Sequence, residues 1–286
     1  MTDPQTQTVN TLTTTNAQNQ GAFPNTSVIA AEDAIPNALI FSLSTISATA
    51  KGDAQTARIA YVDTDPEADY VAEGEELSRK NPTISELVVP TKKVGLITVA
   101  SNESYANDGV PNMLGNSLAR ALAAKADAAF LAEPKSDIGA LGMTGLANMD
   151  GITTGKIDGS LDALIDAIGT VGTNGGTPNA IVMGYDAWAY LLKLKDANKT
   201  PVITPDVANS PTPQLFGIPV VLNTHAAKNT ILLLDSSQIV SAIGDVSLAT
   251  TDQRYFESDS IGLRATFRFG FGVLRPNRLA KLTIGA

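Results

Sequence analysis

The clearest alternation of hydrophobic and polar positions lies near the C-terminal end of the chain. Between residues 263 and 273 every second side chain is apolar, and the intervening positions include Arg264, Thr266 and Arg268. A period of two is typical of a β-strand, because successive side chains point to opposite faces of a sheet. The pattern therefore predicts a long terminal strand with one basic and one hydrophobic face. The hydrophobic face comprises Leu263, Ala265, Phe267, Phe269, Phe271 and Val273.

Two other strand-like regions predict an extended hairpin. The first is Ala57–Val62, and the second runs from Leu87–Val89 through Val94–Val99. About fifteen residues out and back, at about 3.3 Å per residue, would reach roughly 50 Å. A lone two-stranded ribbon of that length buries too little apolar surface to be stable by itself. We therefore expect the hairpin to lie on another surface.

A helical period replaces the alternation between residues 108 and 133. Apolar side chains recur on one face of this segment, at Leu114, Leu118, Leu122 and Phe130. Asp108 is a suitable cap, Pro111 suits the first turn and Pro134 ends the helix. About 23 residues at 1.5 Å each make a rod of roughly 35 Å. We expect its polar residues on a solvated or interfacial face rather than in a catalytic site: Arg120, Lys125 and Asp127.

The following residues predict a compact mixed domain after a glycine-rich connector at residues 139–159. Ser160 is a suitable cap for a second helix, whose apolar face would comprise Leu161, Leu164, Ile165 and Ile168. A short buried strand, Ala180–Met183, then leads into a helix with Ala187, Trp188, Leu191 and Leu192. Strands at Gly217–Leu222 and Thr230–Leu234 follow a proline-rich loop. Helices and strands in this order predict an α+β fold.

The first 31 residues are dominated by Thr, Asn, Gln and Ala, with Asp3 as the only charge. Such a segment buries little apolar surface, so we expect either a flexible tail or an arm that orders on a neighbouring molecule. Its start has neither the basic nor the apolar region of a secretory signal. No apolar run approaches the roughly 20 residues needed to span a bilayer, so we expect no membrane span.

Charge is sorted by sign along the predicted hairpin. The chain has 29 acidic and 20 basic residues, a net charge of −9, which argues against a protein that coats duplex DNA. Within the hairpin seven acids come first: Asp63, Asp65, Glu67, Asp69, Glu73, Glu75 and Glu76. Bases dominate the return at Arg79, Lys80, Lys92 and Lys93, and residues 261–286 carry five bases and no acid. The terminal strand is therefore an electrostatic complement to the acidic half of the hairpin.

Motifs for catalysis or metal binding are incomplete. His225 is the only histidine, and no Gly-x-Ser-x-Gly motif presents a serine to it. Gly151–Lys156 is one residue short of a phosphate-binding loop. The alternating acids after Asp63 resemble calcium ligands, but Ala68 replaces the turn glycine and Gly74 replaces the bidentate glutamate. The absence of cysteine removes disulfides and thiolate metal sites. We predict no enzyme, cofactor or metal site, with a hydrolase using His225 as a remote alternative.

The order of these parts resembles the Hong Kong 97-type major capsid proteins of tailed double-stranded DNA phages. No single motif is diagnostic, but the set in this order covers residues 32–286. The segments that carry the resemblance are Val71–Glu76, Pro90–Gly95, Ser101–Glu103, Leu215–Val221 and Ile261–Arg268.

This resemblance implies five parts: an N-terminal arm (1–45), an extended loop (46–100), a peripheral domain with a spine helix (101–159), an axial domain (160–250) and the return strand of the peripheral domain (251–286). It implies hexamers and pentamers that close into an icosahedral shell around double-stranded DNA, as a virion capsid assembled in the cytoplasm of a host bacterium. It leaves room for a separate scaffolding protein, a portal and decoration proteins. An encapsulin-type shell is the alternative, although the polar arm differs from the amphipathic helix that usually docks cargo there.

Some relatives cross-link a loop lysine to an asparagine of the next subunit. Lys80 would be the amine here, but Asp252–Glu257 contains no asparagine, so we expect a noncovalent shell. The resemblance and the sorted charges together nominate eight residues as contacts between subunits: Glu73, Glu75, Glu76, Arg79, Lys80, Arg264, Arg268 and Arg275.

Overall fold

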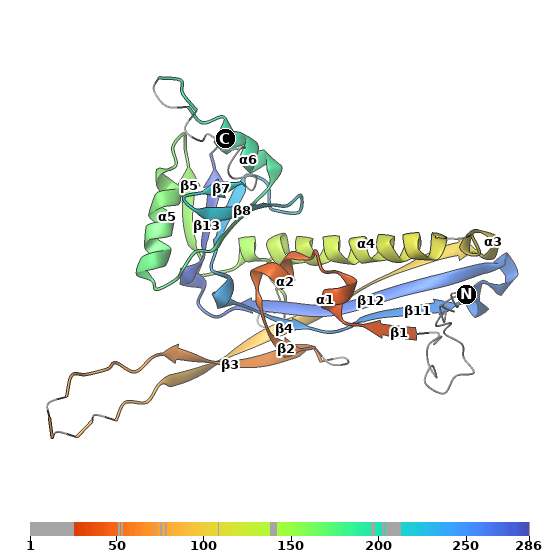
Figure 1. Cartoon of the computed structure of the whole chain (residues 1–286), viewed down its shortest axis with the longest axis horizontal. Coiled ribbons are helices and arrows are strands. Elements are labelled where there is room, and N and C mark those ends of the chain that lie inside the picture. The colour runs from red at the N-terminus through yellow and green to blue at the C-terminus, as the bar shows by residue number, and fades with distance from the viewer. Residues whose placement is uncertain are drawn as a thin grey trace, which may run out of the picture.

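The computed structural model describes an elongated molecule with two β-sheets and a projecting hairpin (Figure 1). It describes residues 26–50, 52, 54–71, 73–74, 76–77, 79–107, 109–137, 142–195, 198–201, 203 and 213–285. The following statements concern those residues. No helix among them is long and apolar enough to cross a membrane.

The larger sheet has seven strands and is organised around the predicted terminal strand, β12 (Ser260–Val273). All six residues of its predicted hydrophobic face are buried, which confirms the alternation. Along β12 run β11 (Val246–Thr251), β10 (Ile239–Ile243) and β4 (Thr83–Ser101), while β1 (Thr26–Ile29) and β2 (Thr45–Thr49) extend the sheet beyond β11 and β10.

The predicted long helix is α4 (Val110–Ala132), which runs along one face of this sheet (Figure 1). Leu118, Leu122 and Phe130 are buried as expected, and Leu114 is half-buried. The Phe130 ring meets Phe271 of β12 edge to face, with centroids 5.0 Å apart. The expected cap, Asp108, lies outside the described residues, and Gly109 precedes the first turn with φ at +87°. A short helix, α3 (Asn102–Tyr105), connects β4 to this turn.

The hairpin predicted from the two strand-like regions is formed by β3 (Thr56–Thr64) and β4, which pair antiparallel over Thr83–Pro90 of β4. Beyond Pro90, β4 turns into the larger sheet and pairs with β12 from Thr91 to Ser101. Gly270 of β12 permits this passage, because a Cβ there would lie 2.2 Å from the Pro90 carbonyl oxygen. Figure 1 shows the rest of the hairpin projecting away from the body.

The smaller sheet has six strands in the order β5 (Thr153–Ile157), β13 (Ala280–Ile284), β9 (Thr230–Leu234), β6 (Ala180–Met183), β8 (Ile218–Leu222) and β7 (Gln214–Leu215). It packs with α5 (Asp162–Thr173) and α6 (Tyr185–Leu192) around a separate core. The predicted strands and helices of this region are therefore present.

Three details of the smaller sheet differ from expectation. Ile165, predicted on the apolar face of α5, is 51% exposed, because the buried face is formed by Leu164, Ala167 and Val171. The predicted connector contains strand β5. In addition, β13 pairs parallel with β5, so the last strand of the chain completes this sheet.

The two sheets use the chain differently from the five predicted parts. The larger sheet includes β10 and β11, which we expected in the axial domain. The smaller sheet includes β13, expected with the return strand, and β5, expected with the spine helix. The sheet that a strand joins is therefore decided by its pairing partners rather than by its position in the chain. The functional division into arm, loop and domains remains a proposal.

Short elements connect these layers. The segment after β1 forms α1 (Ala31–Ala34) and α2 (Leu39–Leu43), whose apolar side chains join the core beneath α4. Single turns of 3-10 helix lie at η3 (Leu146–Asn148), η4 (Ser236–Gln238) and η6 (Pro276–Arg278), and a longer one at η5 (Gln253–Ser258). Of the predicted arm, residues 26–45 are thus packed onto the body, and residues 1–25 lie outside the described part.

Candidate assembly surface

The acidic half of the hairpin is an exposed surface. Glu73, Glu76 and Arg79 are all exposed. Lys80 forms an ion pair with Asp69, with 2.8 Å between nitrogen and oxygen. Glu75 lies outside the described residues. Among the described residues of 65–82 there is no helix or strand.

Apolar side chains accompany these charges. Tyr70 is fully exposed and Leu77 is 78% exposed. Val62 and Ile84 lie opposite each other in the β3–β4 ladder, and both are exposed. Isolated apolar side chains at a surface are ordinary, but a group of them on one narrow projection is typical of a contact surface. This combination of charge and apolar area supports a contact with another molecule.

The basic face of the larger sheet lies opposite the face that α4 covers. Arg264 and Arg268 of β12 pair in register with Ile97 and Lys93 of β4, which places all four on one face. This face borders a hollow of about 650 Å³ lined by Lys93, Arg264 and Arg268, with Asp245 as the only carboxylate among its described lining residues.

The three bases of this hollow differ in their own contacts. Within the part of the chain that the structure describes, the side chains of Lys93 and Arg264 make no hydrogen bond or ion pair. Arg268 donates from Nη1 to the Ala54 carbonyl oxygen and to Thr91 Oγ1, each at 3.1 Å. The hollow therefore presents two cations that form no ion pair with a described residue beside a third that is held in place, and its three bases outnumber the single carboxylate of Asp245, a composition suited to an anionic partner.

Arg275, the last nominated residue, is engaged within its own chain. Its Nη2 donates to the carbonyl oxygens of Val62 and Asp63, the second at 3.0 Å, and its Nη1 lies 3.4 Å from Gln238 Oε1. The guanidinium carbon is 5.7 Å from the centre of the Tyr61 ring. Its place on the body therefore makes it a support of the hairpin.

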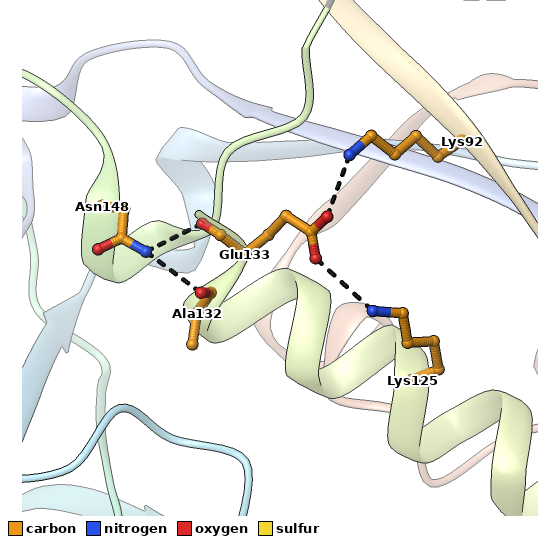
Figure 2. Close-up of polar contacts among 5 residues, drawn as sticks. All are labelled: Lys92, Lys125, Ala132, Glu133 and Asn148. Atoms are coloured by element: carbon orange, nitrogen blue, oxygen red, sulfur yellow. Dashed lines mark hydrogen bonds and ion pairs between the residues drawn. The ribbon is translucent and has the colours of Figure 1, made fainter. Parts of the chain in front are cut away.

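Glu133, at the end of α4, ties the base of the hairpin to the helix (Figure 2). One carboxylate oxygen accepts a hydrogen bond from Lys92 of β4 at 3.0 Å, and the other forms an ion pair with Lys125 of α4 at 3.7 Å. The Asn148 side chain donates to the carbonyl oxygens of Ala132 and Glu133, at 3.2 and 2.9 Å. These contacts satisfy carbonyl groups that the end of a helix leaves unpaired. Helix, hairpin base and loop therefore form one rigid support.

The cluster around Asp127 tests the hydrolase alternative. Asp127 is only 7% exposed, and its carboxylate accepts from the Leu39 amide at 2.8 Å and from Asn223 Nδ2 at 2.9 Å. Asn223 Oδ1 in turn accepts from the His225 amide at 2.7 Å. Burial raises the pKa of Asp127, although the bonds from Leu39 and Asn223 and the nearby His225 oppose that rise. Asp127 is therefore buried inside its own chain, and the expectation of a solvated or interfacial face is wrong for this residue.

The adjoining cavity, about 600 Å³, does not present a nucleophile bonded to a base. Its described lining includes Asp127, His225 and one hydroxyl side chain, Thr224, and no hydrogen bond joins the Thr224 hydroxyl to either of the other two side chains. The His225 contact with the cluster runs through its backbone amide, not its imidazole. The cluster thus joins α2, α4 and the loop after β8, which is a structural role. No group of three or more metal-ligating side chains occurs in the described part of the chain.

Sequence reasoning missed Glu133 and did not identify the supporting roles of Asp127 and Arg275. Their roles depend on partners far away in the chain, such as Leu39 for Asp127 and Val62 for Arg275. The one available signal was Glu133 itself, an acid at the C-terminal end of a helix, where the helix dipole favours cations. Nearby Lys125 and Lys92 offset that unfavourable placement.

Comparisons with known proteins agree on one group. A family model described as "Phage capsid family" matches residues 31–284. A structure from Mycobacterium phage Bobi has a TM-score of 0.65 and 17% identity, covering 87% of this chain and 91% of that chain. One from Microbacterium phage Oxtober96 has a TM-score of 0.66 and 16% identity, covering 92% and 93%. The capsid of an empty GTA particle has a TM-score of 0.67 and 17% identity, covering 86% and 89%. No curated protein matches by sequence.

Proposed function

This chain belongs to the phage capsid family, and we propose that its projecting hairpin carries the contact by which one subunit holds the next. The expected Hong Kong 97-type fold and the expected role as a major capsid protein are confirmed. The protein is a structural component of the virion capsid, assembles with copies of itself into an icosahedral shell, and is not an enzyme.

The observation that carries the proposal is the contrast between two surfaces of the same subunit. One is the exposed acidic and apolar hairpin, and the other is the basic hollow at Lys93, Arg264 and Arg268. In a closed ring every subunit offers both surfaces, so the hairpin of one copy meets the basic face of the next. Glu73, Glu75 and Glu76 then face Arg264 and Arg268, while Arg79 and Lys80 complete the charged region of the loop.

Hexamers and pentamers are the ring sizes that such a shell needs, and the enclosed genome is double-stranded DNA. The net charge of −9 fits a wall that encloses DNA without binding its sequence. A separate scaffolding protein, a portal and decoration proteins are the further partners that we propose. Because the family match is to phage capsids, it favours this function over an encapsulin-type compartment. Purified particles that hold an enzyme instead of DNA would reverse that preference.

A charge exchange tests the pairing. Replacing Glu73, Glu75 and Glu76 with lysine should leave the subunit folded but prevent shell formation, as measured by light scattering and negative-stain microscopy. Each exposed pair contributes only about 0–1 kcal/mol, so the effect arises from repetition over many copies. Assembly of the wild type should also weaken at high salt, which screens exposed pairs.

The matched variant is Lys93→Glu with Arg264→Glu, which should block assembly by itself and restore it when combined with the three lysine substitutions. Efficient shell formation by the lysine variant alone would sink the electrostatic contact. Blocked assembly without rescue in the combined variant would place the partner of the acidic loop elsewhere.

We further propose that the shell is noncovalent. Lys80 is paired with Asp69 in its own loop, and the segment Asp252–Glu257 contains no asparagine. Denatured particles should therefore run as a single band on a gel. A ladder at multiples of the subunit mass would contradict this.

A further inference from the structure

The hairpin leaves the body at a defined point. Near its base, Ala57, Ile59 and Leu87 pack against a small cluster formed by Val89, Val240 and Ala242. Farther out along the β3–β4 ladder, Val62 and Ile84 are exposed, and so is every described residue from 62 to 84. Apolar packing on the body therefore ends next to Tyr61.

The ladder is irregular at the same point. Val62 pairs with Ile84 and Thr64 with Thr83, so the register shifts across Asp63. An extra residue of this kind bends and twists a strand and leaves polar backbone groups without their ladder partner. A bend where support ends is a natural pivot for everything beyond it.

Arg275 lies at this pivot. Its Nη2 donates to the carbonyl oxygens of Val62, the last residue before the irregularity, and of Asp63, the unpaired residue, and its guanidinium stands over the Tyr61 ring. The body holds Arg275 in turn, because Nη1 reaches Gln238 Oε1 and the adjacent Leu274 amide donates to the Gln238 carbonyl oxygen at 2.8 Å. Gln238 itself is buried.

A planar guanidinium suits this position better than an ammonium group. It offers five N–H donors in a fixed fork and stacks on an aromatic face, whereas lysine offers a point charge on a flexible stem. Hydrogen bonds from a charged donor are also stronger than neutral ones. One side chain thereby connects the edge of β3, the Tyr61 ring and the body.

We infer that Arg275 is a positioning residue, which sets the direction of the hairpin on the free subunit before any neighbour is present. The inference rests on the proposed function of the hairpin as the contact between subunits. Beyond the pivot, nine residues each way at about 3.3 Å would extend about 30 Å. A rotation of about 10° at the pivot would then displace the tip by about 5 Å, more than the length of a hydrogen bond.

The absence of cysteine makes a direct test possible. Spin labels on Glu67→Cys, in the loop, and Ala121→Cys, on α4, report the distance between hairpin and body by pulsed electron resonance; both positions are exposed. The full-length unassembled subunit is compared with and without Arg275→Ala. We expect the distance distribution to broaden about twofold, because two charge-assisted bonds are lost.

Three further variants sharpen the result. Arg58→Ala removes an exposed arginine of the hairpin itself, paired with Glu86, and should leave the distribution unchanged. Arg275→Lys should restore the width only in part. Tyr61→Leu removes the stacked ring while keeping the carbonyl bonds, and serves if Arg275→Ala does not fold as judged by circular dichroism.

Each outcome bears on the inference. We call the contacts of Arg275 with Val62, Asp63 and Tyr61 the clamp. A distance distribution equally narrow in Arg275→Ala and in the wild type would show that the clamp does not position the hairpin, whatever happens to assembly. A broad distribution with normal shell yield and diameter would keep the clamp and overturn its importance for assembly. Because the width is measured without a neighbour, it is independent of the charge-exchange test, and failure of that test would remove the proposed contact but not the clamp.

Discussion

The body and the hairpin of this protein are both built from long strands, but they obtain their stability differently. In the body, β12 has hydrogen-bonded neighbours on both sides and buries one whole face beneath α4. In the hairpin, β3 has a ladder partner on one side only. In the outer half of the hairpin, no described side chain is buried against the rest of the subunit.

This difference separates folding from assembly. The body contains two cores that close within one chain, so its residues should govern the free energy of unfolding. The hairpin beyond Tyr61 contributes little to those cores, so its residues should govern the interaction with other subunits. Four substitutions test this division, in order of decreasing effect.

The largest expected effect is in the core of the body. Phe271→Ala removes a ring that is 2% exposed and that meets Phe130 edge to face. Loss of such a buried ring costs about 3–5 kcal/mol. Chemical denaturation should show this loss, while Tyr70→Ala in the hairpin should change the unfolding free energy by less than about 0.5 kcal/mol. Similar destabilisation by both substitutions would erase the distinction.

The second effect is at the junction of the two regions. In Gly270→Ala the added Cβ would meet the Pro90 carbonyl oxygen at 2.2 Å, so β4 must move away from β12. A forced shift of backbone in a packed region costs about 1–3 kcal/mol. Hydrogen exchange should increase at β4 residues near Pro90. The control is Gly115→Ala in α4, where nothing lies within 4 Å; it should stabilise the protein by about 0.5–1 kcal/mol.

The third effect concerns the buried carboxylate of Asp127. Asp127→Ala leaves the Leu39 amide and the Asn223 side chain without their acceptor, at a cost of about 1–3 kcal/mol. The pH dependence has a definite sign. Because the folded-state pKa is raised above 3.8, the folded protein holds this proton more tightly than the unfolded chain.

Its contribution to stability is therefore fully present below pH 3.8 and is lost as the pH rises through the folded-state pKa. The unfolding free energy should be measured for the wild type and for Asp127→Asn across this range. As the pH rises, the unfolding free energy of the wild type should fall relative to that of Asp127→Asn. If the difference between the two free energies is constant with pH, or if the wild type gains stability relative to Asp127→Asn as the pH rises, this carboxylate is not destabilised by burial.

The smallest effect is at the support of the hairpin base. Glu133→Gln weakens the ion pairs with Lys92 and Lys125 (Figure 2) and should cost about 1 kcal/mol or less, because these groups are partly exposed. The loss should shrink in high salt. Glu86→Gln, which breaks the more exposed pair with Arg58, serves as the control and should cost less. Equal costs would mean that the junction carries no special role.

Sequence patterns predicted the long strands and helices well, but they missed many short strands and did not predict which strands pair. The faces of β12 and α4 follow from periods of two and 3.6 residues, which are local properties. Strands β5, β10 and β13 were not predicted as parts of their sheets, because a short apolar run does not specify which strand it will pair with. Ile165 was placed on the wrong face of α5, since a helical period alone allowed a wider apolar face than the packing uses.

The candidate surface shows the same division. Charge sorting along residues 61–104 was visible in the chain and drew attention to the hairpin. It also assigned Arg275 to the basic set, but position in the fold makes that arginine a support of its own hairpin. The charge of Arg275 can be read from the sequence. Its hydrogen-bond acceptors cannot, because they belong to residues more than two hundred positions away.

The sequence by itself determined that this protein has a terminal strand with two unlike faces, a long helix and a polar hairpin too exposed to be stable alone, because periodicity and composition act over short distances. Only the tertiary structure decided that β4 crosses from hairpin to sheet beside Gly270, that Asp127 joins three segments, and that Arg275 supports the pivot. Those arrangements come from contacts between distant residues, and burial and hydrogen bonding there depend on the whole chain being folded.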